Sequence, residues 1–303
     1  MRIHDHLQSI CTKKVATLLE NTNRRNFGNV NYKDGLKFAI LNEPSIEIEV
    51  ISNSSFAIYE GSSALPDING ATLTESRICE FVMGSRRVSN QYSNVEKAKE
   101  SSISSPWLLV TAYYCSFFAI NEISRMLDKI PLGLDSNDQK QLIARIKGDP
   151  AKISQFTNTN PNNFIGKPRG GKIVFDSIGE KPHAAAWSNA QEIMKRINNE
   201  KGWPELAKYI KLFEGNQWKI PSQTRNEWNY KYADYFSTRG EKEAVIFKKL
   251  IGNSPGAHSW FHSAKPTDES SNAASIAVIC ELFSKAVISS YNALFDTGIL
   301  QGK

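Results

Sequence analysis

The fold is decided by residues 104–133, which read SSPWLLVTAYYCSFFAINEISRMLDKIPLG. Ser105 is a good N-cap residue and Pro106 fits a first helical turn, while Pro131 and Gly133 stop the segment about 25 residues later. At 1.5 Å per residue, a helix of this length is about 36 Å long. Its first half is apolar on every side, so we expect it to lie buried at the centre of a helical bundle.

Apolar residues at helical spacing predict further helices on both sides of this stretch. Thr72 and Glu75 have the spacing of a capping box, so a helix should begin there and run towards Lys99. The other expected helices cover about 5–21, 184–199, 204–214, 241–253 and 272–295. The chain is therefore predicted to be mainly α.

Strand-like patterns are confined to a short region near the N-terminus. The segments LKFAIL (36–41), IEIEVI (46–51) and FAIYEG (56–61) predict two or three antiparallel strands. Residues 134–179 are polar and lack periodicity, so they read as an insertion with one possible short strand, KIVF (172–175). We expect a small α+β segment over 1–70 and a helical bundle over 71–303, interrupted by that insertion.

The composition favours a globular, reduced, cytoplasmic protein. The 303 residues carry 37 Lys and Arg against 31 Asp and Glu, a net charge of +6 that allows attraction to nucleic acid. The four cysteines lie far apart without metal-ligand spacing, which indicates reduced core residues. No signal-peptide pattern opens the chain, and the apolar run 107–120 is shorter than the roughly 20 residues that cross a bilayer. We therefore expect no membrane span, metal or cofactor.

The segment SQTRNEWNYKYADYF, residues 222–236, concentrates aromatic and polar side chains. On a helix that begins near Pro221, Arg225 shares one face with Trp228 or Asn229 and with Tyr232. One interpretation is a core stripe of Trp228, Tyr232 and Tyr235, in which Arg225 pairs with a carboxylate.

A second interpretation assigns this segment a function. Arg225, Asn226 and Tyr230 would form a polar cluster against phosphate, because the guanidinium group offers a planar fork that matches phosphate oxygens. The residue types leave the two interpretations open.

The order of these features resembles the HEPN superfamily of helical-bundle ribonucleases. AYYCSFFAINEISRML (112–127) is similar to that family's first bundle helix, and RNEWNYKY (225–232) is similar to its motif region. The resemblance covers roughly residues 97–296. It implies a helical-bundle fold, RNA as partner, metal-independent cleavage, and a homodimer in which the motif residues of two chains meet.

The resemblance also implies roles for individual residues. Arg225 would hold phosphate and transition-state charge, and Asn226 would provide orientation. Position 230 holds Tyr where the family has His. A histidine with a pKa near 6.5 can take a proton from a ribose 2′-hydroxyl, whereas an unperturbed Tyr, near 10, is a poor base. Tyr230 could instead donate a proton to the leaving oxygen or hydrogen-bond a phosphate, with Tyr232 beside it.

Other candidates stand outside the motif. His258 and His262 are four residues apart, but the flanking Pro and Gly favour a loop, where one of them could assist Arg225. His183 stands alone at a helix entrance. Glu122 interrupts the long apolar helix and could orient Arg225 or mark where that helix leaves the core.

The loop GKPRGGK, residues 166–172, is the first candidate for contact with a nucleic-acid backbone. Lys167, Arg169 and Lys172 supply positive charge, and three glycines expose main-chain donors. The spacing of a P-loop is absent, and a solvated turn is the competing interpretation.

Three functional readings follow. The first is a HEPN-like ribonuclease, which the resemblance extends to a toxin or antiviral (antiphage) defence effector that cuts tRNA or other RNA. The second is a HEPN-like helical bundle without catalysis that binds a protein or nucleic-acid partner, which the tyrosine at position 230 favours. The third is an unrelated helical protein, which includes an enzyme with a different site.

Overall fold

The computed structural model describes residues 2–24, 26–61, 72–266 and 269–301. The chain divides into two compact units, each built from several segments. The helical unit comprises Met1–Ser9, Gly84–Ile123 and His183–Tyr291, and the sheet unit comprises Ile10–Met83, Ser124–Pro182 and Asn292–Lys303. The units therefore do not follow the predicted division at residue 70, because each gathers segments from both sides of that position.

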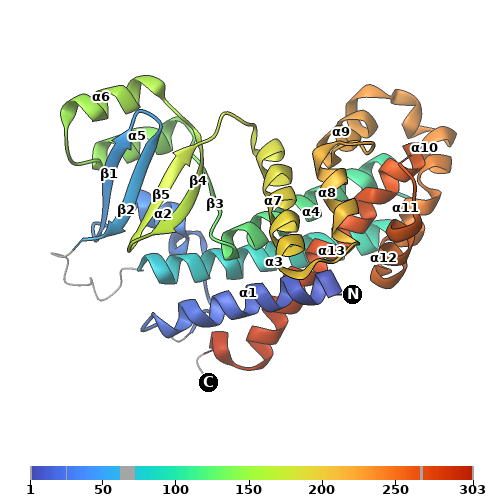
Figure 1. Cartoon of the computed structure of the whole chain (residues 1–303), viewed down its shortest axis with the longest axis horizontal. Helices are drawn as coiled ribbons and strands as arrows, with labels where there is room; N and C mark the ends of the chain where they lie inside the picture. Colours follow the sequence, from blue (N-terminus) through green and yellow to red (C-terminus); the bar gives the residue numbers. More distant parts are fainter. Residues whose placement is uncertain (1, 25, 62–71, 267–268, 302–303) are drawn as a thin grey trace. The chain divides into compact units, whose positions relative to one another are not determined.

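Helices make up the helical unit almost entirely (Figure 1). Four long helices contribute residues to both units: α1 (Arg2–Glu20), α3 (Leu73–Glu100), α4 (Ser105–Met126) and α13 (Glu269–Asp296). The others are α7 (Pro182–Lys201), α8 (Leu206–Glu214), α9 (Pro221–Asn226), α10 (Thr238–Glu243), α11 (Val245–Leu250) and α12 (Ser254–Ser263). The predicted helices in these regions are confirmed, although residues 241–253 contain a break between α10 and α11.

Helix α4 is buried over most of its first half, as predicted, although Trp107 is 49% exposed. Leu109, Ala112, Tyr113 and Cys115 are wholly inaccessible to solvent. The Cys115 thiol lies 3.1 Å from the hydroxyl of Ser284, which joins α4 to α13. The two helices therefore form the interior of the helical unit.

One helix in the described ranges, α13, is long and apolar enough to cross a membrane. Of its most apolar window, 83% is buried inside the protein. This burial is what the central helix of a globular unit shows, since a membrane span would leave its apolar face to lipid.

A charged residue inside α13 shows how this protein satisfies a buried ion. Glu281 is only 1% exposed. Its carboxylate accepts hydrogen bonds from the Tyr92 hydroxyl (2.7 Å), the Gly252 amide (2.8 Å) and the Ser254 hydroxyl (2.6 Å). Three donors replace the lost hydration, as buried charges require.

The sheet unit contains a five-stranded antiparallel sheet in the order β1-β2-β5-β4-β3. Its strands are β1 (Ile46–Ser52), β2 (Ser55–Glu60), β3 (Ile130–Gly133), β4 (Asn163–Arg169) and β5 (Lys172–Ser177). The strands predicted at 46–51, 56–61 and 172–175 are confirmed. The sheet is larger than predicted, because three of its strands come from residues 130–177.

Two expectations for this unit are wrong. The segment LKFAIL is not a strand but belongs to helix α2 (Leu36–Asn42), where Leu36, Ala39 and Ile40 bury one face at spacings of three and four. The region 134–179 is not irregular, since it holds α5 (Ser136–Arg145), α6 (Pro150–Thr159), β4 and β5, and it belongs to the sheet unit.

Helices cover one face of the sheet (Figure 1), where α6 packs on β1 and α2 packs on both β1 and α5. Four phenylalanines form the centre of this second core. Phe56 stacks on its register partner Phe175 at 5.1 Å between ring centroids, and it meets Phe164 and Phe156 edge-on. Residues 134–179 therefore supply three of the four phenylalanines in the core that they share with the N-terminal strands.

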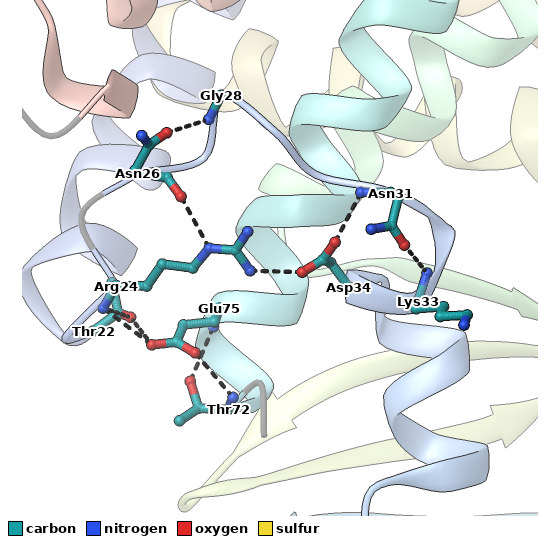
Figure 2. A network of polar contacts seen from close by, with 9 residues as sticks. All are labelled: Thr22, Arg24, Asn26, Gly28, Asn31, Lys33, Asp34, Thr72 and Glu75. Carbon is teal, nitrogen blue, oxygen red and sulfur yellow. Dashed lines mark hydrogen bonds and ion pairs between the residues drawn. The ribbon is translucent and has the colours of Figure 1, made fainter. Parts of the chain in front are cut away.

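The start of α3 is held by the buried carboxylate of Glu75 (Figure 2). The Glu75 carboxylate accepts a hydrogen bond from the Thr72 amide at 3.3 Å, and the Thr72 hydroxyl oxygen accepts one from the Glu75 amide at 3.1 Å. These two bonds confirm the predicted capping box. The same carboxylate accepts from the Thr22 hydroxyl at 2.5 Å and from the Arg24 amide at 3.2 Å. Arg24 continues the network to Asp34 at 2.8 Å.

We expect Glu75→Gln to destabilise the protein by about 2 kcal/mol, because hydrogen bonds to a charged group contribute about 1.5–3 kcal/mol each. The amide of glutamine would also point a donor at a site where every partner is already a donor. Urea denaturation measures the change. Glu20→Gln, at an exposed position, should have no effect, and an equally stable Glu75→Gln protein would contradict the assigned role.

Candidate functional site

The motif segment does not form the regular helix that its sequence predicts. Helix α9 ends at Asn226, and a π-helical turn, η2 (Glu227–Lys231), follows it. The Tyr232 amide closes this turn on the Glu227 carbonyl at 3.2 Å, after which Tyr232 is extended. Arg225 and Tyr232 therefore do not share a helical face, and π turns are frequent at functional sites.

Arg225 lies in the last turn of α9 and is 8% exposed. Its guanidinium carbon lies 5.0 Å from the ring centroid of Tyr113, 5.5 Å from that of Tyr114 and 6.0 Å from that of Tyr230. Tyr113 is wholly buried, whereas Tyr230 is 74% exposed. The guanidinium group thus lies among rings that range from wholly buried to mostly exposed.

No carboxylate pairs with Arg225 in the part of the chain that the structure describes, and its buried Nε atom has no hydrogen-bond partner there. Burial of an ion costs several kcal/mol. Attraction to aromatic faces returns only about 0.5–2 kcal/mol. In contrast to Glu281, Arg225 therefore has no ion-pair partner among the described residues, which give no support to the interpretation that it pairs with a carboxylate.

His183, in the first turn of α7, completes the site. Its Nδ1 atom lies 3.0 Å from the Tyr113 hydroxyl oxygen, which also accepts a hydrogen bond from Trp187 Nε1 at 3.2 Å. The imidazole ring packs on Phe117 at 4.3 Å and on Tyr114 at 5.7 Å between centroids. Because Nδ1 faces Tyr113, Nε2 is the ring nitrogen that is left for a substrate.

The environment favours the neutral forms of His183 and Tyr113 near pH 7. Burial, followed by the positive charge of Arg225, lowers the pKa of His183 below its ordinary 6.5. Burial raises the pKa of the Tyr113 hydroxyl, although the Trp187 N–H and Arg225 oppose this effect. A neutral imidazole beside a cationic guanidinium can accept a proton, and the guanidinium can hold an anion.

The remaining motif residues are placed as follows. Asn226 is exposed at the end of α9, and its side chain makes no hydrogen bond within the described ranges. The Tyr232 ring contacts the Tyr235 ring at 5.1 Å between centroids, and it is not one of the three rings described above beside Arg225. Trp228 is buried against Tyr235 at 4.6 Å, so the core-stripe interpretation holds for these two aromatics.

Glu122 is wholly buried, and it forms an ion pair with Arg87 at 3.5 Å rather than with Arg225. Gly84 makes room for this carboxylate, since a Cβ atom there would come within 2.1 Å of Glu122. Arg87 also covers the ring of Phe118 at 4.7 Å. We therefore infer that Glu122 positions Arg87.

His258 and His262 lie on a helix, α12, so the expectation of a loop is wrong. Asn253 caps this helix by accepting from the Gly256 amide, which explains why Pro255 and Gly256 do not prevent it. His258 is half-buried and its pKa is lowered by burial, whereas His262 is exposed. Within the described ranges, neither histidine contacts Arg225, and no three potential metal ligands come together.

The basic residues of 166–172 belong to the sheet unit. They form a hairpin rather than a loop, because β4 and β5 meet at Gly170 and Gly171, whose positive φ angles suit the turn. Arg169 and Lys172 line a cavity of about 420 Å³ with Arg77. Lys172 pairs with Glu49 at 2.8 Å, and Lys167 is half-buried in β4.

Comparison of the chain with protein-family models, curated proteins and solved structures gave no match. The function of the Arg225 site is therefore inferred from its own chemistry.

Proposed function

We propose that the helical unit is a HEPN-like ribonuclease that cleaves RNA without a metal ion, with Arg225 and His183 as its catalytic residues. The observation that supports this most is the buried guanidinium group without a carboxylate partner in the described ranges. Such a group gains most from an anionic ligand, and its planar fork suits a phosphodiester.

The arrangement suggests an order of proton transfers. Nε2 of neutral His183 takes the proton of a ribose 2′-hydroxyl, and the freed oxygen attacks the adjacent phosphorus. The bond from phosphorus to the 5′-oxygen breaks, and that oxygen leaves with a proton from Tyr230 or water. The products are a 2′,3′-cyclic phosphate and a 5′-hydroxyl, while Arg225 stabilises the charge on the phosphoryl oxygens.

Tyr113 orients the base in this scheme. When Nδ1 of His183 carries its proton, it donates to the Tyr113 oxygen, so that Nε2 presents a lone pair. Trp187 fixes the Tyr113 oxygen from the other side, and its own ring stacks on Phe213 at 5.9 Å. His183 thus supplies the imidazole that position 230 lacks.

We expect the purified protein to cleave a pool of tRNA and mRNA in excess EDTA and to leave single-stranded DNA of the same sequences intact. The scheme needs a 2′-hydroxyl and no cation, so both results follow from it. Gel analysis of end-labelled strands gives the readout. Cleavage of DNA, or cleavage of RNA that EDTA abolishes, would contradict the proposal.

A binding subunit is the second candidate, which the exposed Tyr230 at the motif position favours. In that case the Arg225 site would hold a phosphate of an RNA or protein partner without cutting it. Retention of RNA on the protein without product in the same assay would support this candidate. If cleavage occurs, the toxin or defence role implied by the HEPN resemblance becomes the next question.

A further inference from the structure

Aromatic side chains recur along one face of α4 in the helical unit. Trp107, Tyr114 and Phe118 are separated by seven and four residues, so they share that face over about 17 Å of helix. Trp107 is 49% exposed, and the other two rings are half-buried. The central ring, Tyr114, is one of those around Arg225.

Each outer ring has a partner that extends the surface. Trp107 meets Phe236 edge-on at 6.0 Å, and Phe236 is itself 43% exposed. Phe118 lies under the guanidinium group of Arg87, whose side chain is 51% exposed. The aromatic row, defined as Trp107, Phe236, Tyr114, Phe118 and Arg87, therefore has exposed rings at one end and a guanidinium group over a ring at the other.

We propose that the aromatic row binds the bases of single-stranded RNA that flank the phosphate held by Arg225. This inference rests on the proposed function. Aromatic rings stack on any unpaired base, and arginine adds both stacking and attraction to phosphate. The bases of a duplex are already stacked and paired, so aromatic side chains cannot stack on them.

The composition of the row favours nucleic acid over an apolar protein segment. Trp107 and Phe236 alone would suit an apolar partner. The row, however, includes the Tyr114 ring beside Arg225 and ends at Arg87, whose side chain is 51% exposed although Glu122 lies 3.5 Å from it. An exposed cation over a ring matches a strand that carries one negative charge per nucleotide.

The test uses two oligonucleotides that this chemistry cannot cut. One is a 2′-O-methyl RNA octamer, and the other has the same backbone with abasic positions throughout. Fluorescence anisotropy gives the dissociation constants for the wild type, Trp107→Ala and Trp107→Phe. Tyr32→Ala, which removes a 70% exposed ring from the sheet unit, is the control.

We expect the wild type to bind the base-containing strand at least tenfold more tightly than the abasic strand, since stacking of one base contributes about 1–3 kcal/mol. Trp107→Ala should lose about tenfold for the first strand and nothing for the second, whereas Trp107→Phe and Tyr32→Ala should bind like the wild type. If the wild type bound both strands equally, or if Trp107→Ala bound the base-containing strand as tightly as the wild type, the aromatic row would not be a base-binding surface.

Failure of the row is distinguishable from failure of the proposed ribonuclease. If the protein cuts RNA but binds both octamers equally, the proposed ribonuclease stands and the base-binding row is rejected. If the protein binds the base-containing octamer more tightly but never cuts RNA, the row stands and the proposed catalysis is rejected. Binding of neither strand, with self-association that Trp107→Ala abolishes, would assign these rings to contact between copies of the chain and reject the row.

Discussion

Arg225→Met is expected to abolish RNA cleavage without lowering the melting temperature. Removal of one group that stabilises transition-state charge costs about 10²–10³-fold in rate. Replacement of a buried ion by an apolar side chain of similar length is often neutral or stabilising, and here no carboxylate in the described ranges is left behind. Single-turnover cleavage and thermal unfolding measure the two effects.

The matched control is Arg145→Met in the sheet unit. Arg145 donates to the main-chain carbonyls of Ala39 (3.2 Å) and Ile46 (2.7 Å), and also to those of Ile40 and Glu43. Its replacement should leave cleavage unchanged and destabilise the protein by about 3 kcal/mol, because several carbonyls lose a charged donor. If Arg225→Met destabilised the protein as strongly and cleaved normally, Arg225 would be a structural residue.

His183→Asn is expected to lower the cleavage rate by about 10²–10⁴-fold with little change in KM, since general-base catalysis contributes that much. Asparagine keeps a polar group towards Tyr113 but lacks Nε2. His258→Asn is the control, because His258 is also half-buried with a lowered pKa yet does not contact Arg225 in the described ranges. That variant should cleave at the wild-type rate.

The pH profile separates catalysis from structure at His183. A base works in its unprotonated form, and burial together with Arg225 lowers the pKa of His183 below 6.5. The wild-type rate should therefore fall on acidification, with a midpoint below 6.5, and this acid limb should be absent from the residual activity of His183→Asn. An acid limb that persists in the variant would assign the base to another group.

The sequence predicts local features of the fold well and distant pairings poorly. Helices α4 and α13 are predictable because their caps and apolar positions lie within one segment. The pairing of β2 with β5 is not, since these strands are more than a hundred residues apart. LKFAIL misleads because a six-residue segment with five apolar residues fits either a strand or a buried helix, and here helix α2 packs on β1.

The sequence predicts only part of the candidate site. Arg225 stands out through its residue type and neighbours, and its contact with Tyr230 follows from local geometry. The sequence does not predict that His183 belongs to the site, because it lies 42 residues before Arg225. Only the packing of α7 against α4 brings its imidazole to the rings that surround Arg225. The π turn after Asn226 also has no strong sequence signal, so a regular helix is predicted there and Tyr232 is placed on the wrong face.

In the proposed reaction, Arg225 and His183 cleave RNA through the 2′-hydroxyl. We would test this reaction by mass spectrometry of the ends produced from a DNA oligonucleotide with one ribonucleotide, incubated with the protein in EDTA. We predict a single cut after the ribonucleotide, with a 2′,3′-cyclic phosphate on one fragment and a 5′-hydroxyl on the other, and no product from His183→Asn. A 5′-phosphate end, or the same product from His183→Asn, would contradict the account.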